Sequence, residues 1–313
     1  MLRIALIGCG EHSGIAHAPS LARYAAENPG QIELIAACDL DLAKAKQFCA
    51  QYGFAQAYTD YHQMLEKEKP DACVCVMPQR IITRLGIEML ERGMPCTIEK
   101  PMGDNVQEVR QLAQVAARTR TPHMVSVNRR FLPHLVEARQ WAQEQGPLRF
   151  LSASMLRVRR SEEDFVWGTG MHVVDALRSL GGDVSDFQCF ASREAGGSPW
   201  YWAAMKFAGG AGGLLHVTPT AGVEEEVYEL SGTSYRVQVV NYQGKGTQMR
   251  CWRNGKLEVE QSLDKMTAPF VSRGEYAETC HWISALREGR SPAPGVGDVL
   301  GSAELCAQLM TCK

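Results

Sequence analysis

Short apolar runs alternate with helical patterns along the first third of the chain, and this alternation constrains the fold more than any other feature. The expected strands are LRIALI (2–7), IELIAAC (32–38), ACVCV (72–76), PCTI (95–98) and HMVSV (123–127). Helical patterns fill the intervals, and one of them opens at Asn105 with Glu108 in the capping-box position. Strands and helices at this spacing form parallel βαβ units. We therefore expect a doubly wound α/β domain in residues 1–127, with ligands at the carboxyl ends of its strands.

The pattern changes after Phe131, where most segments become strands separated by short glycine-containing turns. The expected strands are LRFLSASMLRV (148–158), FQCFASRE (187–194), WYWAAMKFA (200–208), GGLLHVT (212–218), EEVYELSG (225–232), YRVQVVN (235–241), QMRCWRNG (248–255) and KLEVEQ (256–261). The expected helices lie at 132–146, about 169–180, about 273–288 and about 297–311. Such turns favour antiparallel hairpins. We expect a second, α+β domain in residues 128–313, with a large, mostly antiparallel open sheet.

Composition excludes several classes of partner. The chain has 313 residues, 33 Lys and Arg against 35 Asp and Glu, and a net charge of −2, so it carries no footprint for nucleic acid or an anionic membrane. No apolar run approaches the roughly 20 residues of a membrane-spanning helix, and the apolar N-terminal run is too short for a signal peptide. The eleven cysteines form no CxxC pair. We expect a cytoplasmic protein with buried thiols and no metal site.

The segment GCGEHSGIAH (8–17) follows the first strand and opens a helix, which is the context of the dinucleotide-binding Rossmann fingerprint. Gly8 permits the tight turn, and Gly10 allows the backbone to approach a pyrophosphate. Ser13 stands where a third glycine is expected, and Gly14 comes one residue later. The alternative is a glycine-rich turn that binds no ligand. We expect these four residues to contact a dinucleotide.

Asp39 ends the second strand, where an acid can accept hydrogen bonds from the adenosine ribose hydroxyls. A carboxylate there repels a 2′-phosphate, and Leu40 and Leu42 supply no positive charge. We therefore expect NAD(H) rather than NADP(H). Asp39 could also be the N-cap of the next helix, a role that does not exclude the first.

The segment TIEKPMG (97–103) places Glu99, Lys100 and Pro101 at the carboxyl end of another strand. A lysine beside a nicotinamide can donate a hydrogen bond to a substrate hydroxyl or polarise a nascent carbonyl. The alternative is a solvated lysine in a turn.

Several of these motifs together resemble the Gfo/Idh/MocA oxidoreductases over nearly the whole chain. They are the GxG at Gly8, the acid Asp39, the tripeptide Glu99-Lys100-Pro101, the segment Asn128-Arg129-Arg130-Phe131 and ELSGTSYRVQV (229–239). The resemblance implies nicotinamide-dependent oxidation or reduction at a hydroxyl carbon of a sugar, cyclitol or related polyol. The resemblance implies that Lys100 is a catalytic residue. We also expect Glu99 and Lys100 to contact the cofactor. The resemblance also implies that Met77, Pro78 and Gln79, which look like the family's Thr-Pro-Asn loop, border the cofactor.

The family's Asp-x-Gly-x-His-x-x-Asp motif is matched by GTGMHVVD (168–175), which implies that His172 is the general acid and base. Gly168 replaces the first acid. Asp175 matches the last acid, lies on the same helical face as His172, and could orient the imidazole or bind a substrate hydroxyl. The upstream segment 162–164 could supply the missing carboxylate.

Two further residues are candidates for the substrate site. Arg157 lies on the first strand of the second domain and could bind an anionic group, although a solvated sheet edge would explain it as well. Asn128 opens the segment at the domain crossover.

Taken together, the motifs predict an NAD(H)-dependent oxidoreductase whose substrate binds in a cleft between the two domains. Two alternatives stay open: a glycosidase of the same family that uses NAD transiently, and a nucleotide-binding regulatory protein without turnover. The resemblance also implies a homodimer or homotetramer formed through the C-terminal sheet.

Overall fold

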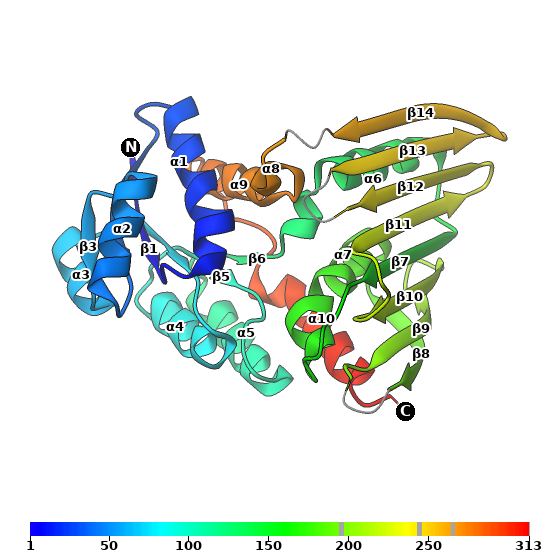
Figure 1. Cartoon of the computed structure of the whole chain (residues 1–313), viewed down its shortest axis with the longest axis horizontal. Coiled ribbons are helices and arrows are strands. Elements are labelled where there is room, and N and C mark those ends of the chain that lie inside the picture. Colours follow the sequence, from blue (N-terminus) through cyan, green and yellow to red (C-terminus); the bar gives the residue numbers. More distant parts are fainter. Residues whose placement is uncertain (194–196, 243–245, 264–266, 313) are drawn as a thin grey trace. The chain divides into compact units, whose positions relative to one another are not determined.

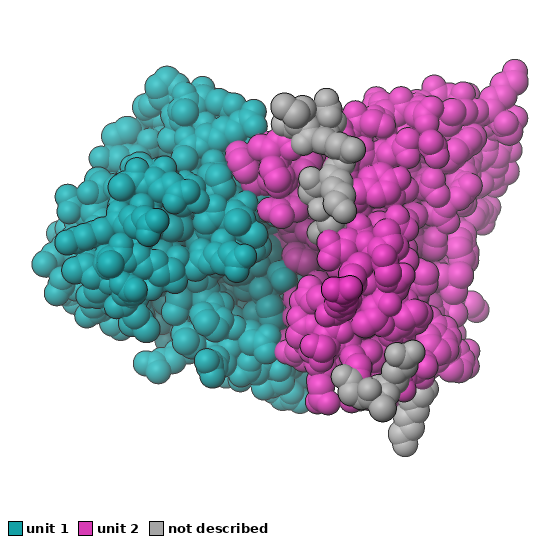
Figure 2. Space-filling model, in the orientation of Figure 1, with its two compact units in different colours: residues 1–126, 275–300 teal, residues 127–274, 301–313 magenta. Residues whose placement is uncertain are grey.

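The computed structural model describes residues 1–193, 197–242, 246–263 and 267–312. The chain forms two compact units: unit 1 comprises residues 1–126 and 275–300, and unit 2 comprises residues 127–274 and 301–313 (Figure 2). We expected two continuous domains that meet at residues 127 and 128. The compact units differ from this division, because a late segment of the chain joins unit 1.

Unit 1 contains a six-stranded parallel sheet in the order β3-β2-β1-β4-β5-β6 (Figure 1). Its strands are β1 (Leu2–Ile7), β2 (Ile32–Cys38), β3 (Gln56–Tyr58), β4 (Ala72–Cys75), β5 (Cys96–Glu99) and β6 (His123–Ser126). Its helices are η1 (Ser13–His17), α1 (Ala18–Glu27), α2 (Leu42–Tyr52), α3 (Tyr61–Glu68), α4 (Gln79–Glu91), α5 (Val106–Thr119) and α9 (Glu275–Arg287). The expected Rossmann fold is confirmed, with β3 as an additional short strand. The strand order reverses between β1 and β4, where such sheets bind ligands.

The late segment 275–300 completes unit 1 beside the edge strand β6. The Val125 amide donates to the Pro294 carbonyl over 2.8 Å, and the Ser126 hydroxyl donates to Glu278 over 2.7 Å. On the same segment, α9 packs against α1, and its Trp282 is buried. The segment therefore supplies hydrogen-bond partners that β6 lacks within residues 1–126.

Unit 2 contains an eight-stranded sheet in the order β14-β13-β12-β11-β7-β10-β9-β8 (Figure 1). Its strands are β7 (Phe150–Leu156), β8 (Val184–Ser192), β9 (Trp200–Phe207), β10 (Gly212–Thr218), β11 (Glu225–Gly232), β12 (Tyr235–Asn241), β13 (Thr247–Arg253) and β14 (Lys256–Leu263). Only β7 and β10 pair in parallel among these described strands, so the expected α+β domain with a mostly antiparallel open sheet is confirmed. Glu194, the last residue of one expected strand, lies outside the described residues.

Helices cover one face of this sheet and leave the other open. The helices of unit 2 are η2 (Asn128–Phe131), α6 (Pro133–Gln145), η3 (Val166–Gly170), α7 (Met171–Gly181), α8 (Pro269–Ser272) and the part of α10 (Val296–Leu309) that follows Leu300. Helix α6 packs against β11, β12 and β13, and α7 packs against β7 and β10. Buried and exposed residues alternate strictly along β9, as expected for a strand with one covered face.

One expectation from the composition needs correction. Cys189 and Cys312 form a disulfide with their Cα atoms 5.9 Å apart, so not all of the cysteines are free thiols. The other nine are free, and all of these except Cys280 are buried. Within the described ranges, no helix combines the length and the apolar character needed to cross a membrane.

Candidate active site

The turn after β1 can be made only by glycine at position 8. Gly8 has a φ of +98°, and a Cβ there would lie 1.9 Å from the Val76 carbonyl oxygen. At Gly10, by contrast, a Cβ would meet no atom within 4 Å. The backbone at Gly10 is therefore open to close approach by a ligand, which is what a pyrophosphate at this loop needs.

The two remaining loop residues, Ser13 and Gly14, form hydrogen bonds within unit 1. Ser13 is fully buried, and its hydroxyl donates to the Gly8 carbonyl. The Gly14 carbonyl accepts a 2.7 Å hydrogen bond from the Tyr52 hydroxyl. The Ser13 side chain thus fastens the turn, which leaves backbone groups as its means of contacting a cofactor.

Asp39 lies at the end of β2, directly beside the glycine loop. Its carboxylate accepts hydrogen bonds from the Cys9 amide over 3.0 Å and from the Asp41 amide over 3.1 Å. The N-cap of α2 is Asp41 rather than Asp39, because the Asp41 carboxylate accepts from the amides of Ala43 and Lys44. The alternative role considered for Asp39 therefore belongs to Asp41.

A positive charge that the sequence reasoning missed lies close to Asp39. The Lys44 ammonium is 3.3 Å from the Asp39 carboxylate and comes from the first turn of α2. The expectation of NAD(H) considered only Leu40 and Leu42. A basic residue in the first turn of the helix that follows Asp39 is the sequence signal for this ion pair.

The loop after β4 borders the glycine turn. The Met77 sulfur would lie 3.2 Å from a Cβ at Gly8, Pro78 is the N-cap of α4, and Gln79 is the first residue of that helix. Ile82 is fully buried in α4. The structure therefore brings Met77 next to the proposed cofactor loop and places Ile82 in the core.

Glu99 ends β5 as a buried carboxylate held by two histidines. Its oxygens lie 3.3 Å from the His12 Nε2 and 2.9 Å from the His17 Nε2. Burial raises the pKa of Glu99, but the His12 charge and the hydrogen bonds from both imidazoles outweigh it and hold that pKa well below its ordinary value. The Glu99 charge in turn raises the pKa of His12. Lys100 follows directly and is half-buried.

His172 and Asp175 both lie on α7 in unit 2, but their environments differ from the expected pairing. His172 is in the first turn and is 9% exposed. Asp175 is fully buried, and it accepts two hydrogen bonds from Arg130 over 2.7 and 2.8 Å and one from Ser302 over 2.8 Å. Asp175 therefore anchors Arg130 and α10, and its carboxylate has no exposed surface to offer a substrate.

The other two residues expected at the substrate are also engaged inside unit 2. Arg157 is 5% exposed and pairs with the fully buried Glu226, which also accepts two 2.8 Å hydrogen bonds from Arg129. Asn128 donates to the Arg273 carbonyl over 2.9 Å and accepts from Arg129 over 3.2 Å. Both side chains therefore take part in buried polar networks, and their expected contact with a substrate stays a prediction.

Gly168 leaves open space where the family motif has an acid. A Cβ at this position would meet no atom within 4 Å. Two of the upstream carboxylates that could have replaced the acid are paired elsewhere: Glu162 with Arg160 over 2.9 Å, and Glu163 with Arg193 over 3.2 Å. Position 168 therefore lacks the acid of the family motif, although a side chain would fit there.

Comparison with known proteins agrees with this geometry. Residues 2–128 match the model of the GFO_IDH_MocA family, described as an oxidoreductase family with an NAD-binding Rossmann fold. These residues are therefore similar to the NAD-binding domain of the Gfo/Idh/MocA oxidoreductases.

The chain is 31% identical over 117 residues to the D-glucoside 3-dehydrogenase of Escherichia coli K12, a match that covers 37% of the chain and 32% of that protein. It is also 31% identical over 140 residues to the inositol 2-dehydrogenase 4 of Saccharopolyspora erythraea, covering 44% of the chain and 40% of the relative. The chain therefore matches well under two thirds of the length of these relatives.

The crystal structure of a Gfo/Idh/MocA family oxidoreductase from Vibrio cholerae has a similar fold. Its TM-score is 0.82 at 23% sequence identity, over 98% of this chain and 96% of that one. This likeness shows that the two-domain fold extends beyond the residues matched by the family model.

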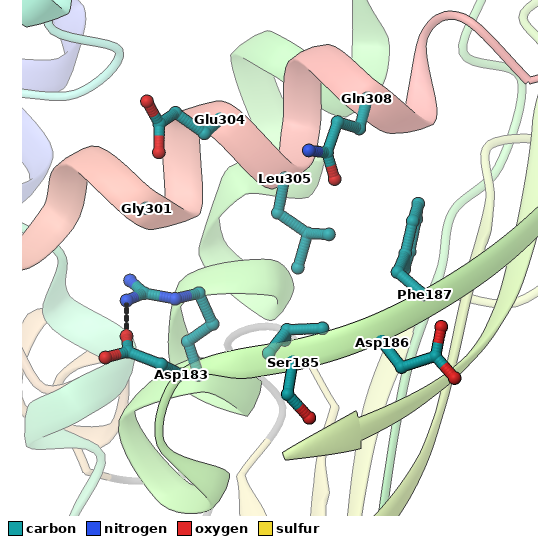
Figure 3. A pocket seen from close by; sticks show the side chains of 10 residues that line it. Asp183, Ser185, Asp186, Phe187, Gly301, Glu304, Leu305 and Gln308 are labelled. Carbon is teal, nitrogen blue, oxygen red and sulfur yellow. Dashed lines mark hydrogen bonds and ion pairs between the residues drawn. The ribbon is translucent and has the colours of Figure 1, made fainter. Parts of the chain in front are cut away.

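A separate cavity of about 380 Å³ lies in unit 2 beside β8 and α10 (Figure 3). Leu305 points from α10 toward β8, and Arg178 pairs with Asp183 at one end. The lining includes none of the residues expected to bind cofactor or substrate. This cavity is therefore distinct from the candidate active site.

Proposed function

We propose that the chain is an NAD(H)-dependent oxidoreductase that transfers a hydride to or from a hydroxyl carbon of a sugar, cyclitol or related polyol. The observation that carries the proposal is the loop in which Gly8 is sterically required, Gly10 is open, and the Cys9 amide is fixed by Asp39. The family match supports the cofactor class, and the D-glucoside and inositol dehydrogenases support the substrate class.

In this proposal, Lys100 and His172 handle the hydroxyl group of the substrate. Bound NAD would accept the hydride from the carbon or return it. Lys100 would donate a hydrogen bond to the oxygen and stabilise the charge that develops there. His172 would take the hydroxyl proton during oxidation and give it back during reduction.

The cofactor contacts are assigned to unit 1. Gly8, Gly10 and Gly14 would offer backbone to the pyrophosphate, and Asp39 would accept from the ribose hydroxyls. The carboxylate favours NAD(H), whereas Lys44 provides a positive charge that could tolerate NADP(H) once Asp39 is removed. Met77, Pro78, Gln79, Glu99 and the backbone of Ser13 would border the cofactor.

The experiment that tests the proposal has two stages. Calorimetry on the purified full chain should show stoichiometric binding of NADH. A panel of polyols and sugar acids with NAD+ should then identify a substrate through NADH absorbance, with His172→Ala expected to lower kcat by about 10²- to 10⁴-fold. A protein that binds neither NADH nor NADPH would disprove the function. Binding without turnover on any substrate would favour a regulatory protein.

We also propose that two copies pair through the open face of the unit 2 sheet. Phe190, Trp202 and Leu214 are 42%, 44% and 48% exposed there, and the Phe190 and Trp202 rings are stacked with centroids 6.0 Å apart. They line an apolar groove of about 570 Å³. Exposed apolar groups in this arrangement are typical of an interface. Light scattering should show a dimer or tetramer that Trp202→Glu converts to a monomer, and a monomeric wild-type protein would contradict the proposal.

A further inference from the structure

Three potential metal ligands converge at the glycine loop of unit 1. His12, His17 and Glu99 each offer one atom, and these atoms all lie within 4.8 Å of one another. The two imidazole rings meet edge to face, with centroids 5.5 Å apart. The Glu99 carboxylate lies between the rings, with one oxygen toward each Nε2 atom.

A local distortion of the helix brings the two histidines to one side. His17 lies five positions after His12, and on a regular α-helix this spacing would turn their side chains well over a quarter-turn apart. Here the segment Ser13–His17 is a π-helical turn, in which the Ala18 amide donates to the Ser13 carbonyl five residues earlier. The wider turn nearly aligns residues five apart, and such turns occur frequently at functional sites.

The donor set matches a divalent transition metal. Two neutral imidazole nitrogens and one carboxylate are the three protein ligands of many open Zn²⁺ sites, with metal–ligand distances of about 2.0–2.2 Å. Two ligand atoms on a common tetrahedral ion are therefore about 3.4 Å apart. The two Glu99 oxygens lie 3.3 and 2.9 Å from the His12 and His17 Nε2 atoms, and one atom from each residue can be chosen so that all three lie within 4.8 Å of one another. Binding an ion would draw these ligand atoms together from within 4.8 Å to about 3.4 Å.

Burial and charge also permit an ion at this place. The side chains of His17 and Glu99 are 8% and 7% exposed, whereas that of His12 is 42% exposed and leaves a route from solvent. Nearby charges oppose each other at His12, because Lys100 lowers the pKa of its imidazole and Glu275 raises it. The cluster therefore has two buried ligands, His17 and Glu99, and one accessible ligand, His12.

We propose that His12, His17 and Glu99 form a binding site for a divalent transition-metal ion, with Zn²⁺ as the best match, whose fourth position is open to water or an anionic ligand. The sequence pattern does not indicate this site, because residues five apart do not share a face of a regular α-helix. The proposal does not depend on the oxidoreductase activity. The alternative is that Glu99 only forms an ion pair that fixes the glycine loop to β5.

Zn²⁺ titrated calorimetrically into the chelator-treated full chain tests the site. Wild-type protein should bind one equivalent through this cluster, and His12→Ala should weaken that binding by at least about 100-fold, since even indirect ligand contacts are worth 10- to 100-fold. The matched control is His62→Ala, which removes an exposed imidazole that lies 3.2 Å from Glu88 and should leave affinity unchanged.

Co²⁺ provides an independent readout of the same site. Wild-type protein and His62→Ala should develop a visible d–d absorption band on adding Co²⁺, and His12→Ala should not. Circular dichroism on each variant verifies that it is folded. Zn²⁺ binding by folded His12→Ala within threefold of wild type, or no stoichiometric binding by wild-type protein, would overturn the proposal.

Discussion

The glycine loop of unit 1 and the polar residues around α7 in unit 2 are specified in opposite ways. In unit 1, the site depends on backbone geometry: Gly8 adopts a φ of +98° and no side chain fits there. In unit 2, charged side chains that the sequence motifs predict at a substrate are paired inside the protein, as Asp175 is with Arg130 and Arg157 with Glu226. The difference shows that a local backbone requirement is readable from sequence, whereas the partner of a charged side chain is not.

The unit 2 half of this comparison is tested most strongly by Glu226→Gln. Removing the charge leaves Arg129 and Arg157 buried without their counter-ion, which should lower the free energy of unfolding by about 3–5 kcal/mol. Urea unfolding of wild type and variant at neutral pH measures the loss. Glu229→Gln, on the same strand but with a half-buried carboxylate, is the control and should cost less than about 1 kcal/mol.

The same residue predicts a pH dependence. Burial raises the pKa of Glu226, but the two arginines outweigh it and lower that pKa to about 2. Because the pKa is depressed in the folded state, the stabilisation is present above the ordinary value of about 4.5 and is lost as pH falls from there toward 2. Glu226→Gln should lack this component of the acid transition, and identical acid profiles for the two proteins would contradict the assignment.

Gly8→Ala tests the unit 1 half. The added Cβ would collide with the Val76 carbonyl in a conformation that L-residues rarely adopt, so we expect a loss of about 3 kcal/mol in unfolding free energy together with NADH binding. Gly10→Ala is the matched control, since its Cβ meets no protein atom: it should weaken NADH binding while changing stability by no more than about 1 kcal/mol. Equal destabilisation by both variants would break the comparison.

Asp39→Ser should shift cofactor preference. It removes the negative charge that opposes a 2′-phosphate and leaves Lys44 in place, so affinity for NADPH relative to NADH should rise about tenfold, or about 1.4 kcal/mol. Calorimetry with both nucleotides measures the ratio. The double variant Asp39→Ser, Lys44→Ala should lose most of this gain, and an unchanged ratio in the single variant would argue against Asp39 at the ribose.

Gly168→Asp should have the smallest effect, because it fills open space. The higher helix propensity of aspartate should raise the free energy of unfolding by about 0.5 kcal/mol at most. Once a substrate is known, the new carboxylate should raise the pKa of His172 and move the acidic limb of the pH profile of kcat/KM upward. Gly168→Asn has the same shape without the charge, so an equal shift in both variants would show that His172 does not respond to it.

The fold could be predicted from sequence because hydrophobic periodicity and turn residues reflect local requirements. The parallel sheet of unit 1 and the open sheet of unit 2 both follow from such patterns. The partners of Asp175 and Arg157 lie 45 and 69 residues away in the chain, and no local pattern links them. The His12–His17 pairing was missed for another reason: it depends on a π-helical turn that regular helical spacing does not indicate.

The place of residues 275–300 in unit 1 has a consequence for how the protein is made. During synthesis, β6 emerges long before its partners, because the Glu278 carboxylate that accepts from Ser126 lies 152 residues further along the chain. At about 5–20 residues per second, that interval lasts roughly 8–30 seconds. The nucleotide-binding domain is encoded first but completed almost last, so during this time its edge strand lies open to wrong partners.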